Sequence, residues 1–173
     1  NVDIFLSAVP YPLNPYLTEI AIKSKTNMDD LGGHTENVIN QIKRTNEAID
    51  ANISIVPDCG MGPGMNVSMA LLAMEGFEKV EEVRVWDGGL PQKPIPPWNY
   101  NLFFNIQGLT NEYDGNAYFI KDGKVIEIPC FEDIETIDFS DSIGTLEAAV
   151  TSGGLSTMPW TYEGKIQILE NKT

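Results

Sequence analysis

The sequence predicts an α/β fold in which a small parallel sheet is followed by a mixed or antiparallel sheet. In the first third of the chain, short apolar segments alternate with segments of helical periodicity. Further along, apolar and polar residues alternate as they do in half-buried strands. Asp122-Gly123 stands between the strand-like segments 117–121 and 124–128 and is typical of a two-residue hairpin turn.

The first part of the chain has the order strand, helix, strand, helix, strand. Apolar segments predict strands at 2–8 and 53–57, and a further short strand is predicted at 28–31, before Gly32-Gly33. Asn14 and Pro15 are typical of an N-cap and a first helical position, and Thr35 can cap a longer helix that runs to about Ala51. This order is that of one half of a doubly wound, Rossmann-type sheet, so we expect residues 1–64 to form the C-terminal half of such a domain.

A third helix is expected at about 66–77, and the methionines around it are expected to pack it: Met61, Met65, Met69 and Met74. Residues 88–98 are rich in glycine and proline and predict an irregular connection. Further strands are predicted at 83–85, 117–121, 124–128, 136–139, 145–151 and 166–170. We therefore expect residues 65–173 to form a second, α+β unit.

The charge of the chain restricts its partners. With 25 acidic and 11 basic residues the formal net charge is −14, which argues against nucleic acid and against an anionic membrane surface. The sequence has two cysteines, without a C-x-x-C pair, and one histidine. This is not the ligand pattern of a zinc site, so we expect no metal. The sequence contains no long apolar run and no signal-peptide pattern, and a cytoplasmic location is the default expectation.

The chain opens on a strand-like segment, 2–6, without a starting Met, and it stops inside another, 166–173. We interpret it as cut at both ends. A sheet edge left open by such a cut predicts strand exchange or, as the simplest assembly, a homodimer.

Three predicted strand ends are candidates for a ligand site, because ligands of open α/β sheets bind beyond the carboxyl ends of the strands. The three loops are 7–10, 30–34 and 58–64. In the last of them, Gly60, Gly62 and Gly64 can cradle an anion or can simply allow a sharp turn. Neither this loop nor any other contains G-x-G-x-x-G, so we expect the pyrophosphate turn of a dinucleotide enzyme to lie upstream.

Individual side chains near these loops have two interpretations each. Cys59 is either a nucleophile or a small packed side chain. His34 lies at a helix N-terminus, where the dipole favours the neutral form that a base needs, and it is otherwise structural. Glu112, Tyr113 and Trp98 either line a pocket or serve packing and surface.

Six stretches in a fixed order resemble the saccharopine dehydrogenase-like family, and most closely its lysine 6-dehydrogenase branch. They cover nearly the whole chain: Ser7-Ala8-Val9-Pro10-Tyr11, Asp30-Leu31-Gly32-Gly33, Asp58-Cys59-Gly60-Met61-Gly62-Pro63-Gly64-Met65, Gly88-Gly89-Leu90-Pro91, Gly144-Thr145-Leu146-Glu147-Ala148, and Thr151-Ser152-Gly153-Gly154 with Thr157-Met158-Pro159.

The resemblance implies an oxidoreductase that uses NAD or NADP and acts on an amino-acid amine. It implies a Rossmann domain followed by a catalytic, substrate-binding and oligomerisation domain like that of glyceraldehyde-3-phosphate dehydrogenase. The cofactor's nicotinamide side would border Ala8, Val9, Pro10, Asp30, Leu31, Gly32 and Gly33. The substrate would meet Cys59, Gly60, Gly62, Pro63, Gly64, Glu112 and Tyr113.

The expected reaction is oxidative deamination of a lysine- or saccharopine-type amine by hydride transfer, and the amine must first lose a proton to a base. The candidates for the base are Asp30, His34 and Asp58. One alternative is a reductase of the same family that forms saccharopine or carboxynorspermidine. Another is a non-enzymatic acidic α/β module for ligand binding or assembly.

Overall fold

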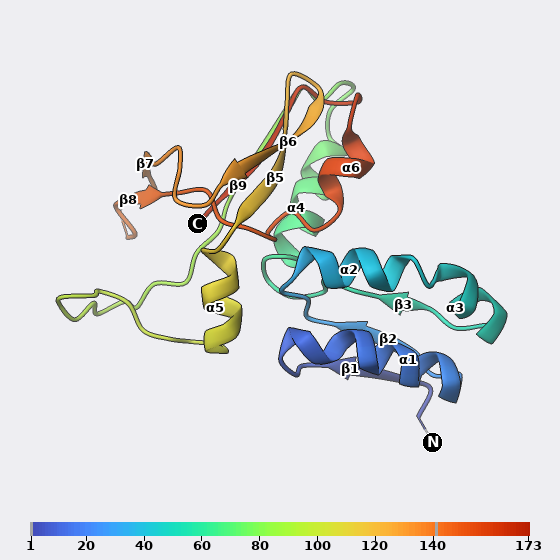
Figure 1. Ribbon diagram of the computed structural model, residues 1–173. Helices are drawn as coiled ribbons and strands as arrows, with labels where there is room; N and C mark the ends of the chain where they lie inside the picture. Colours follow the sequence, from blue (N-terminus) through green and yellow to red (C-terminus); the bar gives the residue numbers. More distant parts are fainter. Residues whose placement is uncertain (1, 141) are drawn as a thin grey trace.

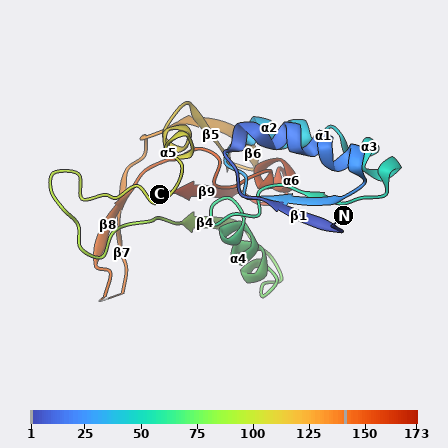
Figure 2. The same ribbon diagram turned by 90° about the horizontal axis from the view of Figure 1, so that it is seen from below.

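A computed structural model describes residues 2–140 and 142–173, and its first sheet is parallel with the order β1-β2-β3 (Figure 1). Three helices cover one face of this sheet, as Figure 2 shows from below. The elements are β1 (Ile4–Ser7), α1 (Asn14–Ser24), β2 (Asn27–Asp30), α2 (Thr35–Ile42), α3 (Thr45–Ala51) and β3 (Ile55–Val56), with a short 3-10 turn, η1 (Tyr11–Leu13), before α1. The predicted order strand, helix, strand, helix, strand is therefore confirmed.

The core of this part lies between the sheet and its helices. Met28 on the central strand is 1% exposed, and Ala21 of α1 and Val38 of α2 are buried with it. Ile4 and Leu6 point to the other face and are more than half exposed. One face of the sheet is thus packed, and the other presents apolar side chains.

Two expectations for these helices are wrong in detail. The helix expected from Thr35 to Ala51 is broken, because Arg44 leaves the helical region and the Thr45 hydroxyl donates to the Ile42 carbonyl. The cap of α2 is His34 rather than Thr35. Asn14 does not cap α1; it is the first helical residue, buried, and its side chain accepts a hydrogen bond from the Ser7 hydroxyl at 2.8 Å.

The second part of the chain contains a mixed sheet with the order β4-β9-β5-β6 and a separate hairpin, β7-β8. Strand β9 runs parallel to β4 and antiparallel to β5. The core of this second part consists of eight buried residues: Ala117, Phe119, Ile120, Val150, Leu155, Met158, Ile166 and Leu169. The elements are α4 (Met65–Met74), β4 (Glu82–Trp86), α5 (Ile106–Glu112), β5 (Asn116–Lys121), β6 (Lys124–Pro129), β7 (Glu135–Asp138), β8 (Thr145–Ala148), α6 (Met158–Tyr162) and β9 (Ile168–Lys172).

The hairpin predicted at Asp122-Gly123 is confirmed. Strands β5 and β6 pair from Lys121 and Lys124 outward, and both turn residues have positive φ, 52° at Asp122 and 76° at Gly123. Positive φ at both central positions is the geometry of a type I′ turn, which follows the twist of the strands.

Gly123→Ala is expected to lower the free energy of unfolding by about 1 kcal/mol, because alanine is strained at positive φ. Steric contact adds little, since an added Cβ would meet Gln167 Nε2 only at 3.6 Å. Urea denaturation measures the loss. Gly76→Ala, at a glycine without positive φ, is the control and is expected to change little. Equal stability of wild type and the Gly123 variant would contradict the turn geometry.

Helix α4 is apolar on most of its surface. The expectation that the four methionines on this helix and just before it are packed is wrong for three of them. Met61, Met65 and Met69 are more than half exposed, whereas Met74 packs against the core.

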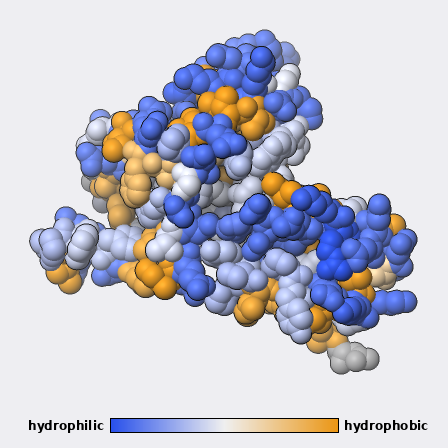
Figure 3. All heavy atoms as spheres, viewed as in Figure 1, coloured by the Kyte–Doolittle hydropathy of each residue, from blue (hydrophilic) through white to orange (hydrophobic). Residues whose placement is uncertain are grey.

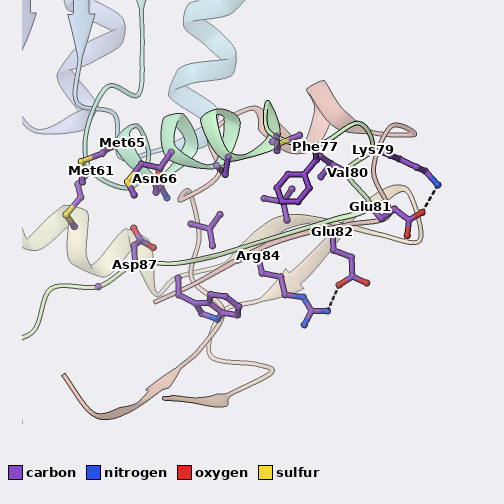
Figure 4. Close-up of a pocket in the computed structure, with 18 residues that line it drawn as sticks. Met61, Met65, Asn66, Phe77, Lys79, Val80, Glu81, Glu82, Arg84 and Asp87 are labelled. Atoms are coloured by element: carbon purple, nitrogen blue, oxygen red, sulfur yellow. Dashed lines mark hydrogen bonds and ion pairs between the residues drawn. The ribbon is translucent and has the colours of Figure 1, made fainter. Parts of the chain in front are cut away.

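The four methionines line an open groove of about 840 Å³ between α4 and β4, with Asn66 and Asp87 at one end and Lys79 and Glu81 at the other (Figure 4). Apolar patches also interrupt the largely hydrophilic face seen in Figure 3. Periodicity shows which residues are apolar, but not which neighbour covers them.

Among residues 2–140 and 142–173, no helix is both long and apolar enough to cross a membrane.

Candidate functional site

The three predicted loops lie on one edge of the parallel sheet and are joined by backbone hydrogen bonds. The Leu31 N–H donates to the Ser7 carbonyl at 3.2 Å, and the Cys59 N–H donates to the Asp30 carbonyl at 2.7 Å. Parallel strands end at the same edge, so their order brings the loops together. The convergence expected from the sequence is therefore present in the structure.

Asp30 holds these loops in place. Its side chain is fully buried, and its Oδ1 accepts hydrogen bonds from the Gly32 N–H at 2.8 Å and the Asp58 N–H at 3.3 Å. Its Oδ2 accepts from Gln41 Nε2 at 2.7 Å. A carboxylate with three donors and no exposure stabilises loop structure and has no open path to a solute.

Asp58 lies beside Asp30 in a different state. Its side chain is 7% exposed, its backbone has φ of 60°, and its Oδ1 finds no hydrogen-bond partner among the residues described. Burial, together with the charge of Asp30, raises the pKa of Asp58 from 3.8 to about 6, although Ser156 and the Gly33 N–H act in the opposite direction. Asp58 therefore exchanges its proton near neutral pH.

Two glycines of the turn are explained by the path of the backbone. Gly60 and Gly64 form a β-bridge, and a Cβ on Gly64 would lie 2.2 Å from the Gly60 carbonyl oxygen. A Cβ on Gly60 would lie 2.6 Å from the carbonyl oxygen of Leu31. Their spacing is thus required by close approach within the protein, which favours the sharp-turn interpretation over a phosphate cradle.

His34 and Cys59 have mainly local contacts. His34 Nδ1 accepts a hydrogen bond from the Asn37 N–H at 3.4 Å, and the ring stacks on that of Tyr11 with 5.2 Å between the ring centroids. Cys59 is an exposed residue, but its thiol is partly desolvated. This partial burial, together with the charges of Asp29, Asp30 and Asp58, raises the pKa of the thiol. A thiol held in its protonated form is a poor nucleophile.

Glu112 is the last residue of α5, and Tyr113 follows it. The Asn111 side chain donates to the Gly33 carbonyl at 2.7 Å, which ties α5 to the second loop. The Tyr113 ring stacks on Phe131 at 4.9 Å. Burial raises the pKa of Glu112, and the charge of Asp87 raises it further. Trp98, by contrast, is 84% exposed in the irregular segment.

Asp87 is a site residue that the sequence reasoning missed. It follows β4 directly, and its Oδ1 accepts a hydrogen bond from Asn171 Nδ2 at 3.2 Å. Asn171 Oδ1 in turn accepts from Asn66 Nδ2 at 3.1 Å, next to the glycine-rich turn. Burial raises the pKa of Asp87. The available signal was its position: an acid at a strand end, immediately before Gly88-Gly89.

Apolar side chains are exposed at this edge of the sheet. Val9 and Leu31 expose 42% and 43% of their surface at neighbouring strand ends, and apolar side chains there can cover a flat ring. Gly32 and Gly33 have positive φ, 73° and 113°, and turn the loop away sharply. No group of three His, Cys, Asp or Glu residues in the described part of the chain is placed to hold a metal ion.

Known proteins resemble the chain in sequence and in structure. The family described as the saccharopine dehydrogenase C-terminal domain matches residues 60–170. The mitochondrial alpha-aminoadipic semialdehyde synthase of Bos taurus is 26% identical over 154 residues, which are 84% of this chain and 15% of that protein. The saccharopine dehydrogenase (NADP(+), L-glutamate-forming) of Saccharomyces cerevisiae is 24% identical over 149 residues, 83% of this chain and 31% of that protein.

A solved structure shows the same fold. The apo saccharopine dehydrogenase (L-Glu forming) from Saccharomyces cerevisiae superposes with a TM-score of 0.74 at 17% identity, covering 99% of this chain and 40% of that chain. The chain thus spans less than half of that structure and 15% to 31% of the two curated relatives. These relatives do not single out the lysine 6-dehydrogenase branch. Because the family match extends over more than half of its residues, the chain belongs to the saccharopine dehydrogenase family.

Proposed function

We propose that this chain forms the nicotinamide edge and the substrate side of an NAD(P)-dependent oxidoreductase that acts on an amino-acid amine of the saccharopine type. Family membership supports the class of enzyme. The yeast relative carries the name saccharopine dehydrogenase (NADP(+), L-glutamate-forming), which favours saccharopine as the substrate. Oxidation of lysine at its ε-carbon is the second candidate, favoured by the six motifs of the sequence.

One observation carries the proposal: the ligand edge of the parallel sheet is hydrogen-bonded directly to the second unit. Asn111 of the second unit donates to the Gly33 carbonyl at 2.7 Å. The Gly64 N–H of the glycine-rich turn donates to Asn66 Oδ1 at 3.1 Å, and Asn66 in turn donates to the Gly154 carbonyl at 3.0 Å. A ligand at this edge would therefore contact both parts of the chain. The proposed division is a Rossmann half at residues 1–64 and a catalytic domain at residues 65–173.

The proposed chemistry assigns each group one task. The nicotinamide supplies the hydride acceptor. Before the hydride leaves carbon, the amine nitrogen must give up a proton, and a group with a pKa near neutrality suits that role. Of the three predicted bases we assign it to Asp58, whose pKa is about 6, because the oxygens of Asp30 are already occupied. Water then adds to the imine and releases the carbonyl compound and the second amine.

Activity of the whole protein tests this directly. With saccharopine and NAD or NADP we expect reduced nicotinamide to accumulate, followed by its absorbance, and with lysine a slower reaction or none. Running the assay in reverse, with an amine and a carbonyl partner, distinguishes a reductase from a dehydrogenase. Light scattering of the same sample tests the predicted homodimer. An enzyme that changes neither cofactor in either direction would refute the proposal.

A further inference from the structure

Asp87 is fixed by a relay of buried amides. Asn171, 1% exposed on β9, donates to Asp87 Oδ1, and Asn66, 8% exposed, donates to Asn171. Asn66 is itself anchored, because its Oδ1 accepts from the Gly64 N–H at 3.1 Å and from the Val67 N–H at 2.7 Å. The carboxylate is therefore aligned relative to the glycine-rich turn by two buried, hydrogen-bonded side chains.

Two glycines leave the space that this arrangement needs, because they carry no side chain. A Cβ on Gly62 would lie 2.0 Å from Asp87 Oδ2, so the second carboxylate oxygen lies directly against the turn. A Cβ on Gly154 would lie 2.7 Å from Asn171 Nδ2. Unlike Gly60 and Gly64, Gly62 is required by a side chain that arrives from another strand.

The carboxylate has no protein cation to balance it. In the part of the chain that the structure describes, Asp87 and Glu112 take part in none of the ion pairs, although seven such contacts occur elsewhere. Asp87 is half-buried and lines the open groove between α4 and β4, so a solute can reach it. A half-buried carboxylate without a protein cation is stabilised when a cationic ligand binds beside it.

We infer that Asp87 receives the positively charged nitrogen of the substrate amine, with Asn171 and Asn66 as its positioning residues. The inference rests on the proposed function and names the group that selects a cationic substrate. Lysine and saccharopine both carry such a nitrogen. L-norleucine has the same amino-acid end as lysine and lacks it, so it reports binding without this contact.

The test compares the Kd values of the three ligands for the whole wild-type protein and for its Asp87→Asn variant. They are measured by isothermal titration calorimetry at neutral pH with cofactor present. Asparagine keeps the size of the side chain and its hydrogen bond from Asn171. We expect Kd for saccharopine and lysine to rise about tenfold or more, the loss typical of a charge-assisted contact, and Kd for L-norleucine to change less than about twofold. Asp50→Asn, which removes one exposed charge on α3, is the matched control and should change none of them.

Gly62→Ala provides a second variant, since its Cβ would displace the carboxylate and should reproduce the selective loss. An unchanged Kd in Asp87→Asn overturns the inference, and so does an equal loss for L-norleucine. Amine oxidation with an Asp87→Asn enzyme of unaltered KM would leave the proposed function intact and refute the role of Asp87. Selective binding that depends on Asp87, without any turnover, would support the role of Asp87 and refute the proposed function.

Discussion

Gly64→Ala is expected to lower the free energy of unfolding by about 3 kcal/mol or more, the largest loss at any glycine of the turn. Gly64 has φ of 135° and ψ of −87°, a backbone region that a side chain rarely enters. Its Cβ would also meet three backbone atoms within 2.7 Å: the Gly60 oxygen, the Gly60 nitrogen and the Cys59 carbonyl carbon. Backbone atoms cannot rotate away as a side chain can, so the turn itself has to open.

Urea denaturation followed by circular dichroism measures the loss, with Gly115→Ala as the matched control. Gly115 also has positive φ, 72°, but an added Cβ meets nothing within 4 Å, so it reports the backbone strain alone, about 1 kcal/mol. The difference between the two variants is the combined cost of the steric contacts and of the more restricted backbone conformation at Gly64. Equal losses would show that the close approach of Gly60 and Gly64 does not exist in solution.

Asp58→Asn is expected to stabilise the folded protein at neutral pH by up to about 3 kcal/mol. The pKa of Asp58 is raised from 3.8 to about 6, and each unit corresponds to about 1.4 kcal/mol of preference for the protonated form in the folded state. Asparagine is neutral at every pH and tolerates the φ of 60° at this position. The variant therefore avoids the cost of ionising a buried acid.

The sign of the pH dependence follows from the raised pKa. Below pH 3.8 the acid is protonated in both states, and the folded state loses nothing. As pH rises toward about 6 the unfolded chain releases the proton and the folded chain keeps it, so wild type becomes less stable. Above that pH the group is ionised in both states, and the difference levels off.

Denaturation of wild type and Asp58→Asn across this range isolates the effect. Asp87 and Glu112 also have raised pKa values and shift stability in the same direction, but they are present in both proteins. The difference in unfolding free energy should grow with pH between about 4 and 6 and then stay constant. A difference that is flat with pH would contradict the buried, unpartnered state of the carboxyl.

Local patterns were sufficient for the elements whose structure depends on near neighbours. The hairpin at Asp122-Gly123 follows from residues that accept positive φ, and strand β1 follows from a short apolar run. The parallel edge was predictable as well, since parallel strands separated by helices must end on one side. Helix α5 and the short helix α6, by contrast, were not predicted from the sequence.

Contacts that a pattern of apolar residues does not show decided the rest. The break between α2 and α3 depends on a hydroxyl–carbonyl contact at Thr45, and helical periodicity continues through it. The exposure of Met61, Met65 and Met69 depends on which neighbours the fold supplies. Neither property can be read from a pattern of apolar residues.

The sequence by itself determined the family, the strand-end loops and the presence of a glycine-rich turn with an acid at its start. Only the tertiary structure separated the roles of the glycines and the acids. Gly60 and Gly64 allow the backbone to approach itself, whereas Gly62 admits Asp87 from a strand more than twenty residues away. Asp30 is saturated with donors and Asp58 is not. The reason is physical: burial and hydrogen bonding are set by residues distant in sequence, and they decide which carboxyl is held by donors and which has its pKa raised.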